Sequence, residues 1–275
     1  MPTLPSPDVS KPGGADHARA YSRRDMAESF GTDPALYDRA RPQYPEALIE
    51  AVAASAVDVL DVGCGTGISS RQLQAAGCRV LGVELDERMA AYARTTGVDV
   101  EVSPFESWDP AGRTFDLLTA GMVWHWIEPA VGGAKAAEVL RPGGRFAAFW
   151  YVLQPPAELG AAFAAVHREV IPDSPAASRA AASPLGAYEH FLDQTAESLT
   201  ATGAFANVER PTFPWSRDYT RDEWLDQLRT SGLAKPLADA GKLDAVLEGT
   251  GAAIDAVGGS FTLDSVAVAL TATRT

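Results

Sequence analysis

"DVLDVGCGTGISSRQLQAAGCRVLGVEL", residues 58–85, places a glycine-rich loop and a helical pattern between two short apolar runs. The runs at 58–62 and 79–85 are too short for helices, which predicts two buried strands. Between them, residues 68–77 have the pattern of a short helix that ends at Gly77. A strand, a loop, a helix and a second strand make a βαβ unit, so this stretch predicts a parallel sheet.

The alternation of strands and helices continues beyond this unit. Further strands are predicted at 99–104, 115–121, 145–152, 206–220 and 260–273, with helices at 86–97 and at 129–144, the latter closed by a Pro-Gly-Gly turn. Prolines interrupt the strand at 206–220, and the strand at 260–273 alternates apolar and polar residues. The sequence therefore predicts an α/β fold. Its doubly wound, mostly parallel, seven-stranded Rossmann-like sheet has an antiparallel C-terminal strand and a helical cover.

The glycine loop predicts a nucleotide ligand at the end of the first strand. A glycine loop between a strand and a helix brings backbone N–H groups and a helix N-terminus to the carboxyl edge of the sheet. Gly63, Gly65 and Gly67 read G-x-G-x-G, whereas the dinucleotide fingerprint needs its third glycine at the position that Ile68 occupies. The loop therefore disfavours a nicotinamide or flavin dinucleotide.

Two acidic residues indicate which nucleotide the loop holds. Asp61 lies two residues before the first glycine, where its charge would repel a pyrophosphate and attract an ammonium or a sulfonium. Glu84 ends the second strand, where a carboxylate accepts the two hydroxyls of an adenosine ribose. A cationic, unphosphorylated adenosine ligand is favoured, which describes S-adenosyl-L-methionine.

The motifs around the loop resemble a known family. "VLDVGCGTG" (59–67) and "VLGVELDERM" (80–89) look like the first two cofactor motifs of the class I S-adenosylmethionine-dependent methyltransferases. "YDRARPQYP" (37–45), "FDLLTAGMVWHWIEP" (115–129) and "EVLRPGGRFAAFW" (138–150) are similar to the type 11 group that contains trans-aconitate methyltransferase-like proteins.

The resemblance implies a set of cofactor contacts. It places Asp61, Gly63, Gly65 and Gly67 around the methionine part of the cofactor. Glu84 would bind the ribose, Leu85 would lie against one adenine face, and Phe105 and Glu106 would flank the adenine. Gly121, Met122 and Tyr37 would lie beside the sulfonium, and Arg41 would pair with the methionine carboxylate. Phe105 departs from the family, where alanine is commoner at this position. Some of these residues have a structural alternative. Gly63 and Gly67 could only make a tight turn, Glu84 could be a solvated strand end and Phe105 a core residue. Arg41 could be a solvated surface charge, and Tyr37 could only pack.

Catalysis of methyl transfer requires alignment more than acid–base chemistry, because the sulfonium already activates the methyl carbon. A general base is needed only for a nucleophile that carries a proton at ambient pH. His125, just after the fourth strand, is the candidate base, and its alternatives are to line the pocket or to orient the loop. Tyr37 is the second catalytic candidate. Trp124 and Trp126 flank His125, and we expect one of them to belong to the core.

Composition limits the partners. A formal net charge of −13 disfavours nucleic acid and anionic membranes. The two cysteines lack metal-ligand or disulfide spacing, which predicts no metal and two buried thiols. Residues 1–17 contain no apolar segment of the kind found in a secretion signal, which predicts a cytoplasmic location. Aromatic residues in the cover favour a small organic acceptor, such as a metabolite or natural product. The alternative is a regulatory protein that binds S-adenosylmethionine without turnover.

The domain organisation follows from the composition along the chain. Residues 1–14 are rich in Pro, Ser and Gly and are predicted to be a flexible tail, followed by a helix within 15–30. Residues 15–275 are predicted to form a single domain. Its cofactor-binding core spans about 31–153, and the helical cover comprises about 154–186 and 221–258.

Overall fold

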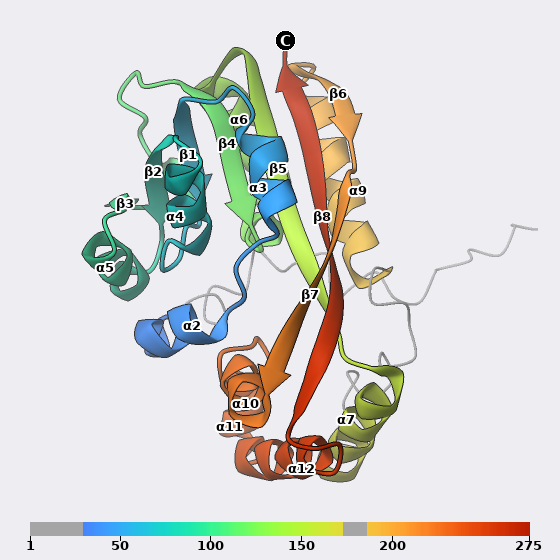
Figure 1. Cartoon of the computed structure of the whole chain (residues 1–275). Helices are drawn as coiled ribbons and strands as arrows, with labels where there is room; N and C mark the ends of the chain where they lie inside the picture. Colours follow the sequence, from blue (N-terminus) through green and yellow to red (C-terminus); the bar gives the residue numbers. More distant parts are fainter. Residues whose placement is uncertain (1–29, 173–185) are drawn as a thin grey trace, which may run out of the picture.

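A computed structural model describes residues 30–172 and 186–275 (Figure 1). The predicted tail, nearly all of the predicted helix at 15–30 and part of the first cover segment lie outside these residues. The parallel half of the sheet has the order β3-β2-β1-β4-β5. Its strands are β1 (Asp58–Val62), β2 (Arg79–Glu84), β3 (Asp99–Val102), β4 (Phe115–Gly121) and β5 (Leu140–Gln154).

The other half of the sheet is antiparallel. β8 (Ser260–Arg274) pairs with β5 along one edge, and β6 (Phe205–Glu209) and β7 (Thr212–Thr220) pair with its other edge. The mostly parallel fold with an antiparallel C-terminal strand is thus confirmed. Eight strands are present in the described residues, where the sequence predicted seven, because β6 and β7 divide the predicted strand at 206–220 at Arg210 and Pro211.

Helices cover both faces of the sheet. α6 (Pro129–Val139) and α9 (Gly186–Ala201) lie on one face, over a core that includes Leu118 and Phe146. α3 (Glu46–Ala53) and α4 (Ile68–Ala75) lie on the other face, over a core that includes Leu117 and Phe149. Side chains along a strand alternate between the two faces of the sheet, so β4 and β5 each contribute residues to both cores. α5 (Glu87–Thr95) packs near β3, and α2 (Pro34–Ala40) precedes α3.

The remaining helices lie beyond the carboxyl ends of the parallel strands (Figure 1). They are α7 (Ala157–Val170), α10 (Arg221–Arg229), α11 (Ala234–Asp239) and α12 (Leu243–Asp255). β5 and β8 have 15 residues each and extend past the ends of β1, β2, β3 and β4 toward these helices. A third core, which includes Tyr219, Trp224 and Leu263, fixes these helices to the extended strands.

One local prediction is wrong. The helix expected at 129–144 ends at Val139, and the Pro-Gly-Gly segment belongs to β5. Phe115 of β4 pairs with Leu140, but Leu117 pairs with Arg145, so the four residues 141–144 of β5 lie opposite the single residue Asp116 and form a bulge within the strand. Gly143 has a φ of +80° there, a conformation that occurs in β-bulges and is unfavourable for residues with a side chain.

Candidate functional site

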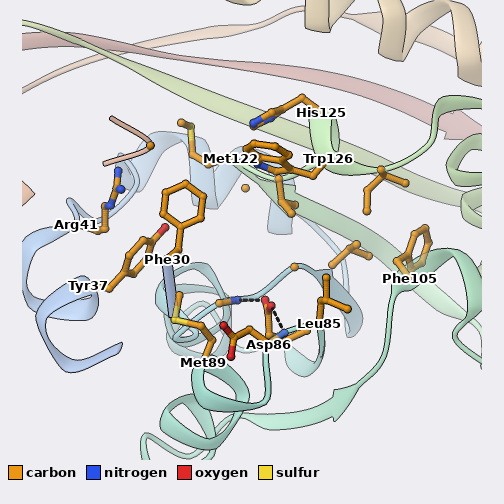
Figure 2. Close-up of a pocket in the computed structure, with 18 of the residues that line it drawn as sticks. Phe30, Tyr37, Arg41, Leu85, Asp86, Met89, Phe105, Met122, His125 and Trp126 are labelled. Atoms are coloured by element: carbon orange, nitrogen blue, oxygen red, sulfur yellow. Dashed lines mark hydrogen bonds between the residues drawn. The ribbon is translucent and has the colours of Figure 1, made fainter. Parts of the chain in front are cut away.

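A cavity of about 790 Å³ lies at the carboxyl edge of the parallel strands, where α/β sheets bind ligands (Figure 2). Its volume is within the range of small-molecule sites. Loops after β1, β2, β3 and β4 form one side, and β5, α2, α9 and the segment after α10 form the other. Most of the predicted site residues line it: Tyr37, Arg41, Gly63, Gly65, Glu84, Leu85, Phe105, Glu106, Gly121, Met122 and His125.

The glycine loop brings its backbone to the cavity wall. Gly63 and Gly65 have φ values of +61° and +58°, which favour glycine. The Gly63 N–H donates to the Val83 carbonyl at 2.7 Å. A Cβ at Gly63 would lie 2.3 Å from Cγ2 of Val123, so this position also lacks room for a side chain.

Gly67 does not line the cavity. It caps α4 in the left-handed conformation, with a φ of +86°, and a Cβ there would lie 3.0 Å from Val98. Its place in the structure is that of a turn residue packed against a neighbouring segment.

Asp61 requires a correction, because its carboxylate does not face the ligand. The residue is fully buried behind the loop and does not line the cavity. One oxygen accepts hydrogen bonds from the hydroxyls of Ser69 and Ser70, at 2.8 and 2.6 Å, and the other accepts from Thr119 at 2.8 Å. Burial raises the pKa of Asp61, and the three hydroxyls oppose that shift. The carboxylate therefore ties β1 to α4 and β4.

Glu84 does lie at the cavity wall. Its Oε2 accepts the Gly65 N–H at 2.8 Å and its Oε1 accepts the Asp86 N–H at 2.9 Å. Burial raises the pKa of Glu84, and these two backbone donors oppose the rise. Each carboxylate oxygen accepts more than one hydrogen bond, so Glu84 retains capacity for the hydroxyls of a ribose.

The residues predicted to flank the adenine lie together on the same side. Leu85, Phe105 and Glu106 line the cavity after β2 and β3. Phe105 is both a wall residue and a core residue, because it is 3% exposed and packs 5.9 Å from Trp124. The departure from the alanine common in the family thus fills the core next to the cavity. Glu106 Oε1 accepts the Glu128 N–H at 3.2 Å.

A cation and two aromatic rings form the opposite end of the cavity (Figure 2). The Arg41 guanidinium lies 4.7 Å from the centroid of Tyr37 and 5.9 Å from that of Phe30. Arg41 Nη2 donates to the Thr230 carbonyl at the end of α10, and the buried Nε has no partner in the described residues. Arg41 has no carboxylate partner among the ion pairs of the described chain. Burial raises the pKa of Tyr37.

The loop after β4 is held in a strained conformation. Met122 has a φ of +57°, which is unusual for a residue with a side chain. Its N–H donates to the Phe149 carbonyl at 2.8 Å, and its Sδ accepts the Tyr151 N–H at 3.3 Å. Gly121 precedes it, and a Cβ there would lie 2.5 Å from the Tyr44 hydroxyl. The backbone at Gly121 therefore lies tightly between Tyr44 and the sheet.

His125 lines the cavity, as expected, but its contacts do not suit a general base. The Trp150 Nε1–H donates to Nδ1 of His125 at 3.1 Å. Burial lowers the pKa of His125 to about 3. Of the flanking tryptophans, Trp124 is buried and Trp126 lines the cavity, so the expectation that one belongs to the core is confirmed.

Sequence reasoning missed part of the wall. The missed residues include Asp86, Met89, Tyr188, Gln227, Ser231 and Leu233. Asp86 and Met89 had a local signal, because they belong to the second cofactor motif. The others come from α9 and from α10 and the segment after it, which carry no motif and reach the cavity only through the tertiary fold.

The described residues show neither a metal-ligand cluster nor a membrane-spanning helix. In residues 30–172 and 186–275, no group of three or more His, Cys, Asp or Glu is arranged to hold a metal ion. No helix of the described chain is long and apolar enough to cross a membrane. Cys64 and Cys78 are both free and buried, as predicted.

Comparison with known proteins identifies the part of the chain that carries this site. Residues 60–148 match the family model described as a methyltransferase domain. Over these residues the chain is similar to methyltransferase domains. The Rossmann-like sheet agrees with this similarity. The trans-aconitate subgroup is not among the matches described below.

Curated relatives match this domain over part of their length. An uncharacterized methyltransferase of Mycobacterium tuberculosis is 37% identical over 137 residues, which cover 47% of this chain and 54% of the relative. A malonyl-[acyl-carrier protein] O-methyltransferase of Hahella chejuensis is 32% identical over 137 residues, covering 46% of this chain and 49% of the relative. The matches thus span about half the length of these curated relatives.

A solved structure matches more of the fold. A protein from Anaeromyxobacter dehalogenans, titled as a type II methyltransferase, aligns with a TM-score of 0.59 and 24% identity. The alignment covers 85% of this chain and 97% of that one. The likeness therefore extends over most of this chain and is a likeness of fold.

Proposed function

We propose that this protein is an S-adenosylmethionine-dependent methyltransferase that methylates a small organic acceptor. The observation that carries the proposal is Glu84 at the cavity wall, held by the Gly65 N–H beside the left-handed glycine loop. A carboxylate in this position suits a ribose and disfavours a phosphate. We propose the type 11 group with its trans-aconitate methyltransferase-like members as the nearest subgroup, on the resemblance of the motifs alone.

The wall residues fit the cofactor in a defined order. Glu84 would hold the ribose and Leu85 and Phe105 the adenine. At the other end, Arg41 supplies the cation that a methionine carboxylate requires. The bound cofactor supplies a methyl carbon activated by the sulfonium; the backbone at Gly121 and Met122 and the ring of Tyr37 would border that methyl group.

The rest of the cavity suits a small acceptor. Its wall beyond the cofactor side is aromatic and aliphatic: Trp126, Tyr151, Val152, Leu153, Tyr188 and Leu233. Such walls bind organic ligands through apolar contact and a few polar groups. The net charge of −13 supports a small acceptor over nucleic acid or a membrane, and a cytoplasmic location remains a prediction of the sequence.

Calorimetry with S-adenosylhomocysteine and with NAD tests the cofactor. We expect binding of S-adenosylhomocysteine only, and NAD binding alone would refute the proposal. A screen with methyl-labelled S-adenosylmethionine and a set of small acceptors then tests turnover. Binding of the cofactor without label transfer to any acceptor would favour the alternative, a non-catalytic regulatory protein.

A further inference from the structure

His125 is held by two contacts on the acceptor side of the cavity. Trp150, fully buried on β5, donates its indole N–H to Nδ1 of His125 at 3.1 Å. The ring of Phe191, on α9, stacks on the imidazole with centroids 4.7 Å apart and an interplanar angle of 27°. The two contacts fix both the position and the rotation of the imidazole. Figure 2 shows His125 at the cavity wall.

The indole contact also fixes where the proton of His125 lies. Trp150 can only donate, so Nδ1 must be the unprotonated nitrogen and Nε2 must carry the hydrogen. Burial keeps the pKa of the imidazole at about 3, which holds this neutral form at physiological pH. Nε2 has no partner in the described residues, although the imidazole lines the cavity. His125 therefore offers a hydrogen-bond donor and has no lone pair free to take a proton.

Two tyrosines of the cavity wall are not bases either. Burial raises the pKa of Tyr188 to about 12 and raises that of Tyr37, so both hydroxyls keep their protons. Arg41 is a permanent cation. The carboxylates of the wall (Glu84, Asp86 and Glu106) follow β2 and β3, on the side assigned to the cofactor.

We propose that His125 is a fixed hydrogen-bond donor to the methyl acceptor and that Trp150 is its positioning residue. This inference rests on the proposed function for the acceptor but not for the state of His125. In this role the imidazole would hold an acceptor atom that carries a lone pair, and it would not take a proton from the acceptor.

Nitrogen NMR of the histidine rings tests the state of His125 without any ligand. Its signals are identified by their loss in His125→Gln. We expect only the Nε2–H tautomer in the wild-type protein from pH 5.5 to 8, and a mixture of tautomers in Trp150→Phe. An Nδ1–H tautomer or an imidazolium in the wild type would overturn the assignment, and the wild-type spectrum decides even where Trp150→Phe does not fold. The result is independent of cofactor binding, so a failure of the proposed function would be recognised separately by calorimetry.

Kinetics with labelled cofactor test the role. The Gln side chain can accept from Trp150 through its oxygen and donate through its nitrogen, so it copies the donor but cannot act as a base. With an acceptor found in the screen, we expect His125→Gln to keep kcat/KM within about fivefold and His125→Ala to lose at least tenfold; His190→Gln, outside the wall, is the matched control. Equal losses in the Gln and Ala variants would overturn the donor role.

Discussion

The buried carboxylate of Asp61 gives the sharpest test of how the loop is held. Asp61→Ala leaves the hydroxyls of Ser69, Ser70 and Thr119 without their acceptor at a fully buried position. An unmade buried hydrogen bond costs about 1–3 kcal/mol. Part of the loss is recovered because a charge no longer has to be buried and because the serines can donate to backbone carbonyls. The costs of the three lost hydrogen bonds add up, and we expect a loss near the lower end of that sum. The free energy of unfolding should therefore fall by about 3 kcal/mol.

The assay compares stability with cofactor affinity in the same variant. We expect the Tm to fall by about 5–10 °C, whereas the affinity of the folded protein for S-adenosylhomocysteine stays within about threefold, because the carboxylate does not reach the cavity. Glu50→Ala, an exposed carboxylate on α3, is the matched control and should change neither quantity. An unchanged Tm together with a tenfold weaker affinity would refute the reasoning and restore Asp61 as a direct contact of the cofactor.

Three further predictions concern the loop and its neighbours. Glu84→Gln should weaken S-adenosylhomocysteine binding at least about tenfold in calorimetry, because an amide offers one acceptor oxygen in place of two charged ones; an unchanged affinity would remove Glu84 from the ribose site. Burial raises the pKa of Glu84, so wild-type affinity should fall as the pH is lowered through that raised pKa, and a similar fall in Glu84→Gln would assign the effect to another group. Gly63→Ala should destabilise the fold by about 2 kcal/mol through its positive φ and the contact with Val123. Adding Val123→Ala should recover part of this loss in urea unfolding, and strictly additive losses would contradict the contact.

The sequence predicted the parallel sheet well because each strand is a short apolar run with a glycine or a turn at its end. The residues 58–62 and 115–121 were predicted with the bounds that β1 and β4 have in the structure. The bulge in β5 was missed because Pro-Gly-Gly also makes an ordinary turn, and only the pairing with β4 decides between the two.

The site shows why two carboxylates near one loop cannot be assigned from spacing alone. Asp61 is within the strand, so the alternation of side chains directs it to the hydroxyls of α4 and β4. Glu84 is the last residue of its strand and meets the loop from the neighbouring strand. The serine pair at 69 and 70 was a local signal for the buried role. His125 had no such signal, because its partner Trp150 is 25 residues away and is brought beside it by the tertiary fold.

The central position of β8 has a consequence for biosynthesis. β5, β6 and β7 all pair with this strand, so a nascent chain that has not yet emerged beyond residue 259 contains three strands with unfilled edges. Such edges pair readily with other chains, and proline is a common protection against that pairing. Pro211 and Pro214 lie in and beside β7. We expect these two prolines to protect the unpaired edge of β7 until β8 has been synthesised and can pair with it.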